Sequence, residues 1–330
     1  MSTGSVPLGR DTLAQRVGAI AQRYGASATL VALVVAASIL SPNFLSASNI
    51  RLQLQGFALS TALIAVGQTL VILTGGIDLS VGSLLAVGSC TAAALLARGA
   101  PIPVAFLAPI AVTAALGALS GTIIAKTRIQ PIVATLAVMI AARGFAQLIA
   151  GDATIQVTNT PFDALATTQL GPIPVVGSIP ISVLIALAVY AGAGFVLART
   201  VLGRSIIAVG GNPRAARLAG IDADGVRIAV YTASGALAGF AGVLYASYNS
   251  TADPLNDGLF FELTTIAAVV VGGTRLLGGT GGVWRTFVGG LILAVLYALF
   301  VQVGLPTPTQ LIAQGLIIAG AVILQGGQET

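Results

Sequence analysis

The stretch from Thr74 to Leu84, TGGIDLSVGSL, places an aspartate beside a glycine pair in one of the most apolar regions of the chain. Over the whole sequence 56% of the residues are hydrophobic and 8% are charged, whereas a soluble domain carries roughly 25% charged residues. So few polar side chains cannot cover a domain that faces water, but helices surrounded by lipid do not need them. The sequence therefore predicts an integral membrane protein.

Outward from this stretch, ten segments are apolar enough to cross a bilayer, which takes about 20 residues as a helix. They lie near 26–41, 57–74, 79–97, 101–125, 131–151, 179–198, 228–249, 262–277, 284–304 and 308–325. We expect an all-α, polytopic membrane protein with about ten transmembrane helices. Residues 1–25 form an N-terminal tail, and residues 26–330 form a single transmembrane domain.

The basic residues orient this array. Arg10, Arg16 and Arg23 precede the first span, Lys126 and Arg128 follow the fourth, and a basic loop at 199–227 follows the sixth. An even number of spans separates these groups, so they share one side, which is the cytoplasm by the positive-inside rule. Both termini are then cytoplasmic. A cleaved signal peptide at LSAS is the alternative, but cleavage would remove the first span, so we favour an uncleaved signal-anchor.

Several function classes are excluded. The chain has no histidine and a single cysteine, Cys90, so disulfide frameworks, histidine-bearing metal sites and histidine-dependent catalytic triads are absent. No GxxxxGK[ST] pattern occurs and Lys126 is the only lysine, so the chain lacks the usual ATP-binding loop. We predict no catalytic residue, no metal site and no nucleic-acid partner, since the formal charge of +5 is explained by topology.

The loop at 199–227 contains AVGGNPRAARLAGI. Asn212 is a favoured N-cap, Pro213 fits the first helical position, and Gly220 suits the left-handed residue after a helix end. Arg214, Arg217 and Leu218 fall on or near one face of this short helix. Such a helix suits insertion into a groove of another protein, although it could equally lie on anionic lipid headgroups.

Asp78 admits two interpretations. Gly75 and Gly76 can end one helix while Asp78 caps the next by accepting hydrogen bonds from amides near Ser80 or Val81. Alternatively, the helix break lines a permeation path and offers polar atoms of Asp78, Ser80 and Ser83 to a hydroxyl-rich solute. The capping interpretation is favoured from the residues alone.

Other features fit a helical bundle. The glycine-rich stretch from Val269 to Trp284, VVVGGTRLLGGTGGVW, is either a second helix break that shares a site with the first or, as we favour, a cytoplasmic turn that touches a partner. GxxxG pairs at 117/121 and 235/239 predict close helix packing, within the chain or at a subunit interface. We expect Arg143 to face the inside of the bundle, near Gln147. The external acids, Asp253 among them, are either hydrated loop ends or a docking surface.

The strings GGIDLSVGS and AVGGNPRAARLAGI resemble the permease subunit of bacterial ABC importers for simple sugars, the ribose, xylose and galactofuranose type. The resemblance covers about Ala26 to Leu324. It implies that the loop helix couples to an ATPase subunit that binds ATP and Mg²⁺, and that the chain itself carries no cofactor. The implied coupling residues are Arg204, Asn212, Pro213, Arg214, Arg217, Leu218 and Gly220.

The resemblance also implies a second permease subunit, identical or paralogous, an external periplasmic or lipid-anchored sugar-binding protein, and a place in the bacterial inner membrane. We therefore expect a permease that passes a monosaccharide through the lipid bilayer. Aromatic residues make up only 5% of the chain, so platforms for stacking sugars are expected to be scarce. The alternatives are a stand-alone secondary transporter or facilitator, and an ABC permease for another solute such as a branched-chain amino acid.

Overall fold

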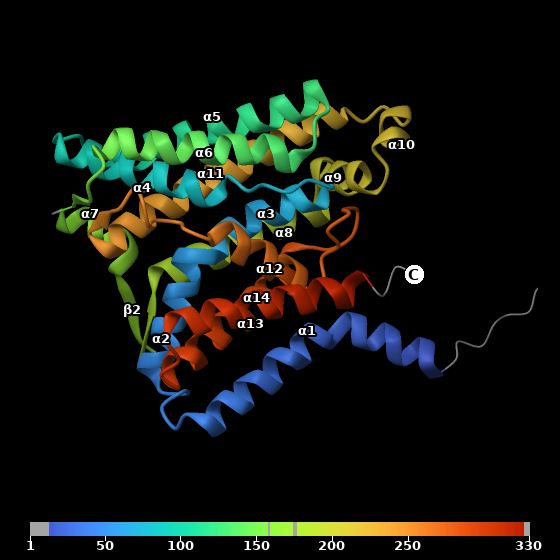
Figure 1. The fold of residues 1–330 in the computed structure, drawn as a ribbon, viewed down its shortest axis with the longest axis horizontal. Helices are drawn as coiled ribbons and strands as arrows, with labels where there is room; N and C mark the ends of the chain where they lie inside the picture. The colour runs from blue at the N-terminus through green and yellow to red at the C-terminus, as the bar shows by residue number, and fades with distance from the viewer. Residues whose placement is uncertain (1–12, 158, 174–176, 327–330) are drawn as a thin grey trace, which may run out of the picture.

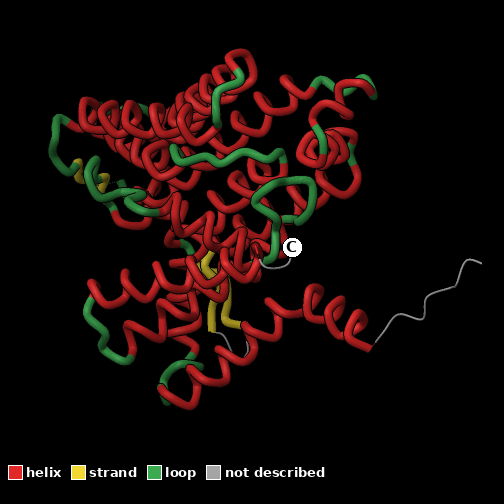
Figure 2. The backbone as a smooth tube through the Cα atoms, turned by 45° about the vertical axis from the view of Figure 1, so that its right-hand side comes forward, coloured by secondary structure: helices red, strands yellow, loops and turns green. Residues whose placement is uncertain are grey.

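The computed structural model describes residues 13–157, 159–173 and 177–326. In this part of the chain helices dominate and the strands form only two short antiparallel ladders (Figure 2). In chain order the helices are α1 (Leu13–Leu40), α2 (Ala47–Phe57), the π-helical turn η1 (Ala58–Ala62), α3 (Leu63–Leu73), α4 (Val81–Ala97), α5 (Ile102–Thr127), α6 (Pro131–Ala150), α7 (Thr160–Thr167), α8 (Ile181–Arg199), α9 (Val201–Gly211), α10 (Pro213–Leu218), α11 (Ala223–Asn249), α12 (Phe261–Val271), α13 (Val283–Gln302) and α14 (Thr307–Gly326). Strand β1 (Ile155–Gln156) pairs with β4 (Thr251–Ala252), and β2 (Gln169–Ile173) pairs with β3 (Gly177–Pro180).

Six helices are long and apolar enough to cross a membrane in the described part of the chain. They are the continuous helix formed by α2, η1 and α3, together with α5, α6, α8, α11 and α13. Shorter apolar helices accompany them: residues 25–40 of α1, then α4, α9 and α12. The prediction of a helical, polytopic membrane protein is confirmed, and each of the ten predicted spans overlaps a helix.

The continuous helix of α2, η1 and α3 forms the centre of the bundle. In its most apolar window 89% of the residues are buried, against 17% for α8 and 22% for α5. Every residue from Leu63 to Leu73 is buried. A helix that is apolar all round belongs inside a bundle, so the remaining helices shield this one from the surroundings.

The two predicted GxxxG pairs pack on each other. A Cβ atom on Gly117 of α5 would lie 3.1 Å from the Cα of Gly235 in α11, and a Cβ on Gly235 would lie 3.1 Å from the Cα of Gly117. One turn further, a Cβ on Gly121 would lie 2.9 Å from the Cα of Ile228. The small residues let α5 and α11 approach closely, and their role is packing within the chain.

The bundle has two distinct ends (Figure 1). Helices α9 and α10 lie at one end, called the α10 end below; α7 and the β2–β3 ladder lie at the other, called the α7 end. The side chain of Asn159 caps α7 by accepting from the amide of Phe162 at 3.1 Å. This short helix was not predicted.

Three differences from the sequence prediction concern boundaries. Helix α1 begins at Leu13, so the second half of the predicted N-terminal tail is helix continuous with the first span, whereas residues 1–12 lie outside the described residues. The second span starts earlier, because the hydroxyl of Ser46 caps α2. The eighth span is shorter than predicted, since it ends at Val271 before Gly272 and Gly273, the latter with φ +85°.

Candidate functional site

Helix α10 has the caps that its sequence predicts. The side-chain oxygen of Asn212 accepts from the amides of Arg214 and Ala215, each at 3.0 Å, and Pro213 is the first helical residue. After the helix, Gly220 adopts φ +83°, and the amide of Ile221 returns to the carbonyl of Ala216 at 3.0 Å. The helix is therefore capped at both ends by its own sequence. The preceding helix α9, whose first turn Thr200 caps, was not predicted.

The outer face of α10 is open in the described structure. Leu218 is 91% exposed, Arg214 is exposed, and Arg204 of α9 is exposed nearby in sequence. Only Ala216 turns inward, and it is 4% exposed. A large apolar side chain held this far out on a rigid, doubly capped helix is typical of a surface that a partner covers.

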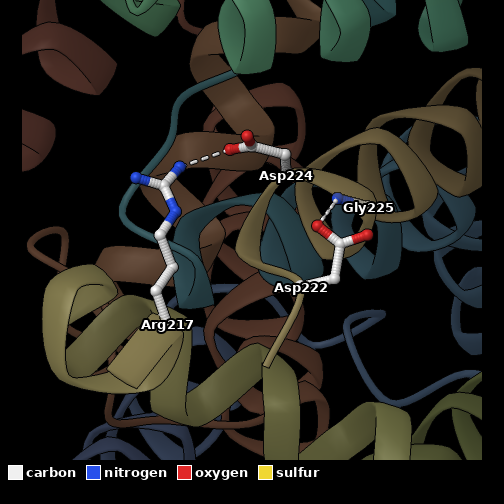
Figure 3. A network of polar contacts seen from close by, with 4 residues as sticks. All are labelled: Arg217, Asp222, Asp224 and Gly225. Atoms are coloured by element: carbon white, nitrogen blue, oxygen red, sulfur yellow. Dashed lines mark hydrogen bonds and ion pairs between the residues drawn. The ribbon is translucent and has the colours of Figure 1, made fainter. Parts of the chain in front are cut away.

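The side chain of Arg217 is bound by an acidic residue of the same chain (Figure 3). Its guanidinium forms an ion pair with Asp224 in the first turn of α11, while the carboxylate of Asp222 accepts from the amide of Gly225 at 3.0 Å and caps α11. Both ion-pair side chains are more than 30% exposed, so the pair contributes about 0–1 kcal/mol to stability. The pair links α10 to the first turn of α11.

A cavity of about 590 Å³ opens beside α10. Four arginines line it: Arg214 and Arg217 from α10, Arg128 from the turn between α5 and α6, and Arg227 from α11. Gly75, Asn212 and Pro213 also line it. The structure thus brings Gly75 of the first glycine stretch close to several of the predicted coupling residues. From the sequence, Arg128 and Arg227 were expected only to orient the spans, because their clustering with α10 depends on tertiary contacts.

The two glycine-rich stretches meet at the α10 end. The amide of Gly279 donates to the carbonyl of Leu73, the last residue of α3, at 3.0 Å. A Cβ on Gly278 would lie 2.7 Å from the amide nitrogen of Gly75, and a Cβ on Gly279 would lie 2.9 Å from the Cα of Gly211. The loop at 272–282 is therefore a tightly packed turn against α3 and α9. The stretch is thus a turn, as favoured from the sequence, but it also contacts the first helix break, as the alternative interpretation expected.

The first helix break runs from Thr74 to Ser80, between α3 and α4, as an extended segment (Figure 1). Asp78 is completely buried there. One of its carboxylate oxygens accepts from the amide of Ser80 at 3.0 Å and from its hydroxyl at 2.6 Å; the other accepts from the hydroxyl of Ser234 in α11 at 2.9 Å. Both oxygens are thus occupied by protein donors.

The prediction that Asp78 is the N-cap of the next helix is wrong in position. Ser80 is the N-cap of α4, and no side chain closes that cap. Asp78 lies two residues earlier, because the chain stays extended past Gly76 before it turns into the helix. Its predicted hydrogen bond with the amide of Ser80 is confirmed.

Side chains of two helices satisfy the backbone of this break. The hydroxyl of Thr135 in α6 accepts from the amide of Leu79 at 3.1 Å, and the hydroxyl of Tyr231 in α11 donates to the carbonyl of Ile77 at 3.4 Å. Irregular backbone inside a membrane protein needs such partners. Ser83 is buried in the first turn of α4.

A second helix break, distinct from the glycine-rich stretch at 269–284, lies at 253–260 between α11 and α12, where an external loop was predicted. Arg143 of α6 reaches it and donates to the carbonyls of Pro254 at 3.0 Å and Asp257 at 2.8 Å. The carboxylate of Asp257 is buried and accepts from the hydroxyl of Ser89 in α4 at 2.7 Å. The prediction that Arg143 faces inward is confirmed, although its partners are main-chain carbonyls.

At the start of this segment Asp253 forms a local turn. Its carboxylate accepts from the side-chain amide of Asn256 at 2.8 Å and from the amides of Leu255 at 2.8 Å and Asn256 at 3.1 Å. These bonds, the one from the Asn256 side chain first, hold the pKa of Asp253 below its usual value. Asp253 is therefore occupied in shaping the loop.

The two breaks touch where α4 and α12 begin. A Cβ on Gly258 would collide with the carbonyl of Gly82, and a Cβ on Gly82 would collide with the carbonyl of Gly258 and the carboxylate of Glu262. Gly258 has φ +70°, and Phe260 has φ +63°, an uncommon conformation for a bulky residue. Two interrupted helices thus meet with their amino ends together, an arrangement found in transporters built around discontinuous helices.

The described residues contain no group of three or more histidine, cysteine or acidic side chains that could hold a metal ion. Cys90 is a buried free thiol.

Comparison with known proteins identifies the family. Residues 50–322 match a protein family described as "Branched-chain amino acid transport system / permease component". The chain belongs to this permease family. The ribose import permease protein RbsC of Escherichia coli (strain K12) is 39% identical over 305 residues, which cover 91% of this chain and 92% of that protein.

Two further relatives agree. RbsC of Bacillus subtilis (strain 168) is 35% identical over 308 residues (92% and 93% of the two chains), and the D-allose transport system permease protein AlsC of Escherichia coli (strain K12) is 34% identical over 307 residues (92% and 91%). No solved structure matches the chain. The permease is the membrane-embedded transport subunit of a bacterial ABC importer, located in the inner membrane, and not an enzyme.

Proposed function

We propose that this permease forms the membrane pathway for a monosaccharide that an external binding protein delivers, and that a partner ATPase drives the import. The observation that carries the proposal is identity of 34–39% along nine-tenths of the chain to permeases named for ribose and D-allose. Permeases named for galactofuranose and fructose are also similar. A second permease subunit, identical or paralogous, completes the pathway.

We also propose ten membrane crossings in a single transmembrane domain, with both termini in the cytoplasm. The charge distribution supports this orientation. The α10 end carries the arginines of the lined cavity, together with Arg204 and the basic residues of the 272–282 loop and its flank, Arg275 and Arg285. By the positive-inside rule the α10 end is then cytoplasmic and the α7 end external.

Helix α10 is proposed as the coupling helix. Arg204, Asn212, Pro213, Arg214, Arg217, Leu218 and Gly220 shape or present the surface that docks into the ATPase. The exposed Leu218 supplies an apolar anchor, and the arginine-lined cavity fits an acidic side chain of the ATPase. ATP and Mg²⁺ are bound by that partner, whose hydrolysis cycle moves α10.

The stretch with Gly75, Gly76, Asp78, Ser80 and Ser83 is proposed as a structural helix break and not as a contact for the solute. Full occupation of the Asp78 carboxylate by Ser80 and Ser234 supports this choice. An ion-coupled secondary transporter would need acids accessible at membrane depth, and burial of Asp78 in a satisfied network argues against it. The description of the matched family keeps a branched-chain amino acid as the second candidate solute.

The test of the proposed function is purification of the tagged permease from its native membrane in nanodiscs, followed by identification of bound proteins and by ATP-driven uptake of labelled D-ribose and L-leucine in proteoliposomes. We expect an ATPase to co-purify and a sugar to be imported. Transport-active permease that reproducibly lacks an ATPase would overturn the importer assignment, and uptake of leucine without sugar would assign the amino-acid branch.

The coupling surface is tested by Leu218→Asp, with Leu170→Asp as the control, because Leu170 is also exposed but lies in β2 at the α7 end. Leu218→Asp should lower ATPase co-purification about tenfold, and Leu170→Asp should not. Arg217→Glu should abolish uptake. The double variant Arg217→Glu with Asp224→Arg reverses the ion pair. If Arg217 contacts the ATPase, this double variant should still lack uptake. Recovery of uptake would show that Arg217 only positions α10.

A further inference from the structure

A second large cavity, about 590 Å³, lies towards the α7 end. It is a partly open cavity bordered by the start of the central helix (α2 and η1), the end of α11, the 259–261 segment, α12, α13 and α14. It extends from Asn249 and Thr307, near the α7 end, to Gly290 and Ile317 deeper in the bundle. Cavities of roughly 300–1,000 Å³ accommodate small-molecule ligands, so its size suits a single monosaccharide with some water. We call it the α13–α14 chamber.

The lining of the chamber is mostly apolar, with several polar groups and no charged one. None of the described residues that line it is an acid or a base; its polar groups are amides and hydroxyls, among them Gln53, Asn249, Thr264, Gln310 and Gln314. A charged solute would need an opposite charge in such a setting. The amino end of α12 could attract a carboxylate, but Glu262 already occupies its first turn. The lining therefore matches a neutral solute rather than a zwitterionic amino acid.

Three side-chain amides of the chamber use their nitrogen atoms within the protein and leave their oxygen atoms as acceptors. The side-chain nitrogen of Gln310 donates to the carbonyl of Leu305 at 2.7 Å, that of Gln314 donates to the hydroxyl of Thr264 at 3.0 Å, and that of Asn249 donates to the carbonyl of Tyr245 at 3.1 Å. Within the described residues no donor occupies the oxygens of these three amides. Sugar hydroxyls are donors that can satisfy such oxygens.

Aromatic residues concentrate in the same place. The sequence holds 11 Phe, 6 Tyr and 1 Trp, and seven of these aromatic residues line the chamber. Tyr297 is 60% exposed, Phe260 is 49% exposed and Tyr248 is 37% exposed. Phe260 belongs to the second helix break, where its positive φ turns the chain into α12. The expected scarcity of stacking platforms is therefore true of the chain but not of this chamber.

From this geometry we infer that the α13–α14 chamber is the site through which a neutral, polyhydroxylated solute of monosaccharide size passes, recognised by the amides of Asn249, Gln310 and Gln314 and by the rings of Tyr248 and Tyr297. The inference rests on the proposed function and adds its location and chemistry. It places the solute beside the second helix break and away from Asp78.

The first test compares uptake of four labelled sugars, D-ribose, D-allose, D-fructose and D-galactose, by the complete complex. Gln314→Leu and Tyr297→Leu should each lower uptake about tenfold or change the ratio among the sugars, while ATPase co-purification stays at the level of the unmodified permease. Gln147→Leu and Phe195→Leu are matched controls outside the chamber and should leave both measurements unchanged. Uptake by both chamber variants that equals that of the unmodified permease would overturn the inference.

The second test asks whether water or an apolar partner fills the chamber. The only native thiol, Cys90, is completely buried, so the unmodified permease provides an unlabelled background. Thr264→Cys should react with a membrane-impermeant, charged thiol reagent in assembled complexes, and Phe195→Cys, on the exposed side of α8, should not. Reaction of Thr264→Cys with an apolar maleimide alone would show that lipid or a second subunit fills the chamber, and the inference would fall.

The two hypotheses fail in different ways. If the unmodified complex binds its ATPase but imports none of the sugars, the proposed monosaccharide function is wrong. If it imports a sugar and the chamber variants behave as the unmodified permease does, the function stands and only the chamber assignment is wrong.

Discussion

The two helix breaks both leave backbone groups without helical hydrogen bonds inside the bundle, but their surroundings differ. Between α3 and α4, the break is closed: Asp78 is completely buried, and side chains of α6 and α11 form hydrogen bonds with backbone groups that have no helical partner. Between α11 and α12, Arg143 and Ser89 bind the chain on one side. On the other side Leu259 and Phe260, 44% and 49% exposed, line the α13–α14 chamber. Irregular backbone persists in a membrane protein when protein covers it or when it borders a cavity, and this permease uses both.

The comparison suggests a division of labour. The first break begins next to the glycine turns and the arginine-lined cavity at the α10 end, whereas the second begins at the α7 end and borders the chamber. We therefore associate the first with transmission from the ATPase and the second with the solute. The substitutions below test whether the two breaks are separable in this way.

The largest effect is expected where the breaks touch, for Gly258→Val. Gly258 has φ +70° and its missing Cβ would strike the carbonyl of Gly82, so strain and overpacking together should cost about 2–6 kcal/mol. The yield of monodisperse protein by size-exclusion chromatography should fall sharply. Gly304→Val is the matched control, because Gly304 has φ +72° but open space around its Cβ position, and should lose far less. Equal losses of yield in the two variants would mean that the close contact between Gly258 and Gly82 does not contribute to stability.

A smaller effect is expected in the closed break for Asp78→Leu. Removal of the carboxylate leaves the buried groups of Ser80 and Ser234 without their acceptor, at a cost of about 3 kcal/mol. The thermal midpoint in detergent should fall clearly. Asp78→Asn keeps an acceptor oxygen and should fold with near-normal stability. A variant Asp78→Asn that folds and binds the ATPase but imports nothing would contradict the structural role.

The smallest loss of stability is expected in the open break for Arg143→Met. The aliphatic stem is retained while the hydrogen bonds to the carbonyls of Pro254 and Asp257 disappear, which should cost about 2 kcal/mol. Because this segment borders the chamber, uptake should fall more than the thermal midpoint does. Arg143→Lys, which can still donate to one carbonyl, should retain partial uptake. If Arg143→Met lowers stability but the folded protein retains full uptake, the second break is not associated with the solute as proposed.

Local signals made part of this structure predictable. The caps of α10 depend on Asn212, Pro213 and Gly220, which act on neighbouring amides and carbonyls, so the sequence contains the whole explanation. The membrane spans follow from hydropathy for the same reason. The GxxxG pairs predicted close packing but not its partner, because a small residue indicates only that something approaches.

The second break and its clamp were not predictable in this way. Pro254 and Gly258 were visible in the sequence, but their neighbouring acids suggested a hydrated external loop. Arg143 binds main-chain carbonyls more than 100 residues away, and every residue type has such a carbonyl, so no sequence pattern identifies the partner. The chamber likewise depends on aromatic residues from five separate segments, which the low overall aromatic content concealed.

The contacts among Gly75, Gly210, Gly278 and Gly279 have a consequence for how this protein can evolve. At the α10 end, main chain rests on main chain: the carbonyl of Leu73 bonds to the amide of Gly279, and a Cβ on Gly210 would lie 2.6 Å from that same amide nitrogen. If α10 is the coupling helix, as proposed, its motion would reach the central helix through these main-chain contacts rather than through a particular side chain. We therefore expect substitutions of the exposed Leu277 side chain to be tolerated and substitutions of these glycines, which have little or no room for a Cβ, to be harmful.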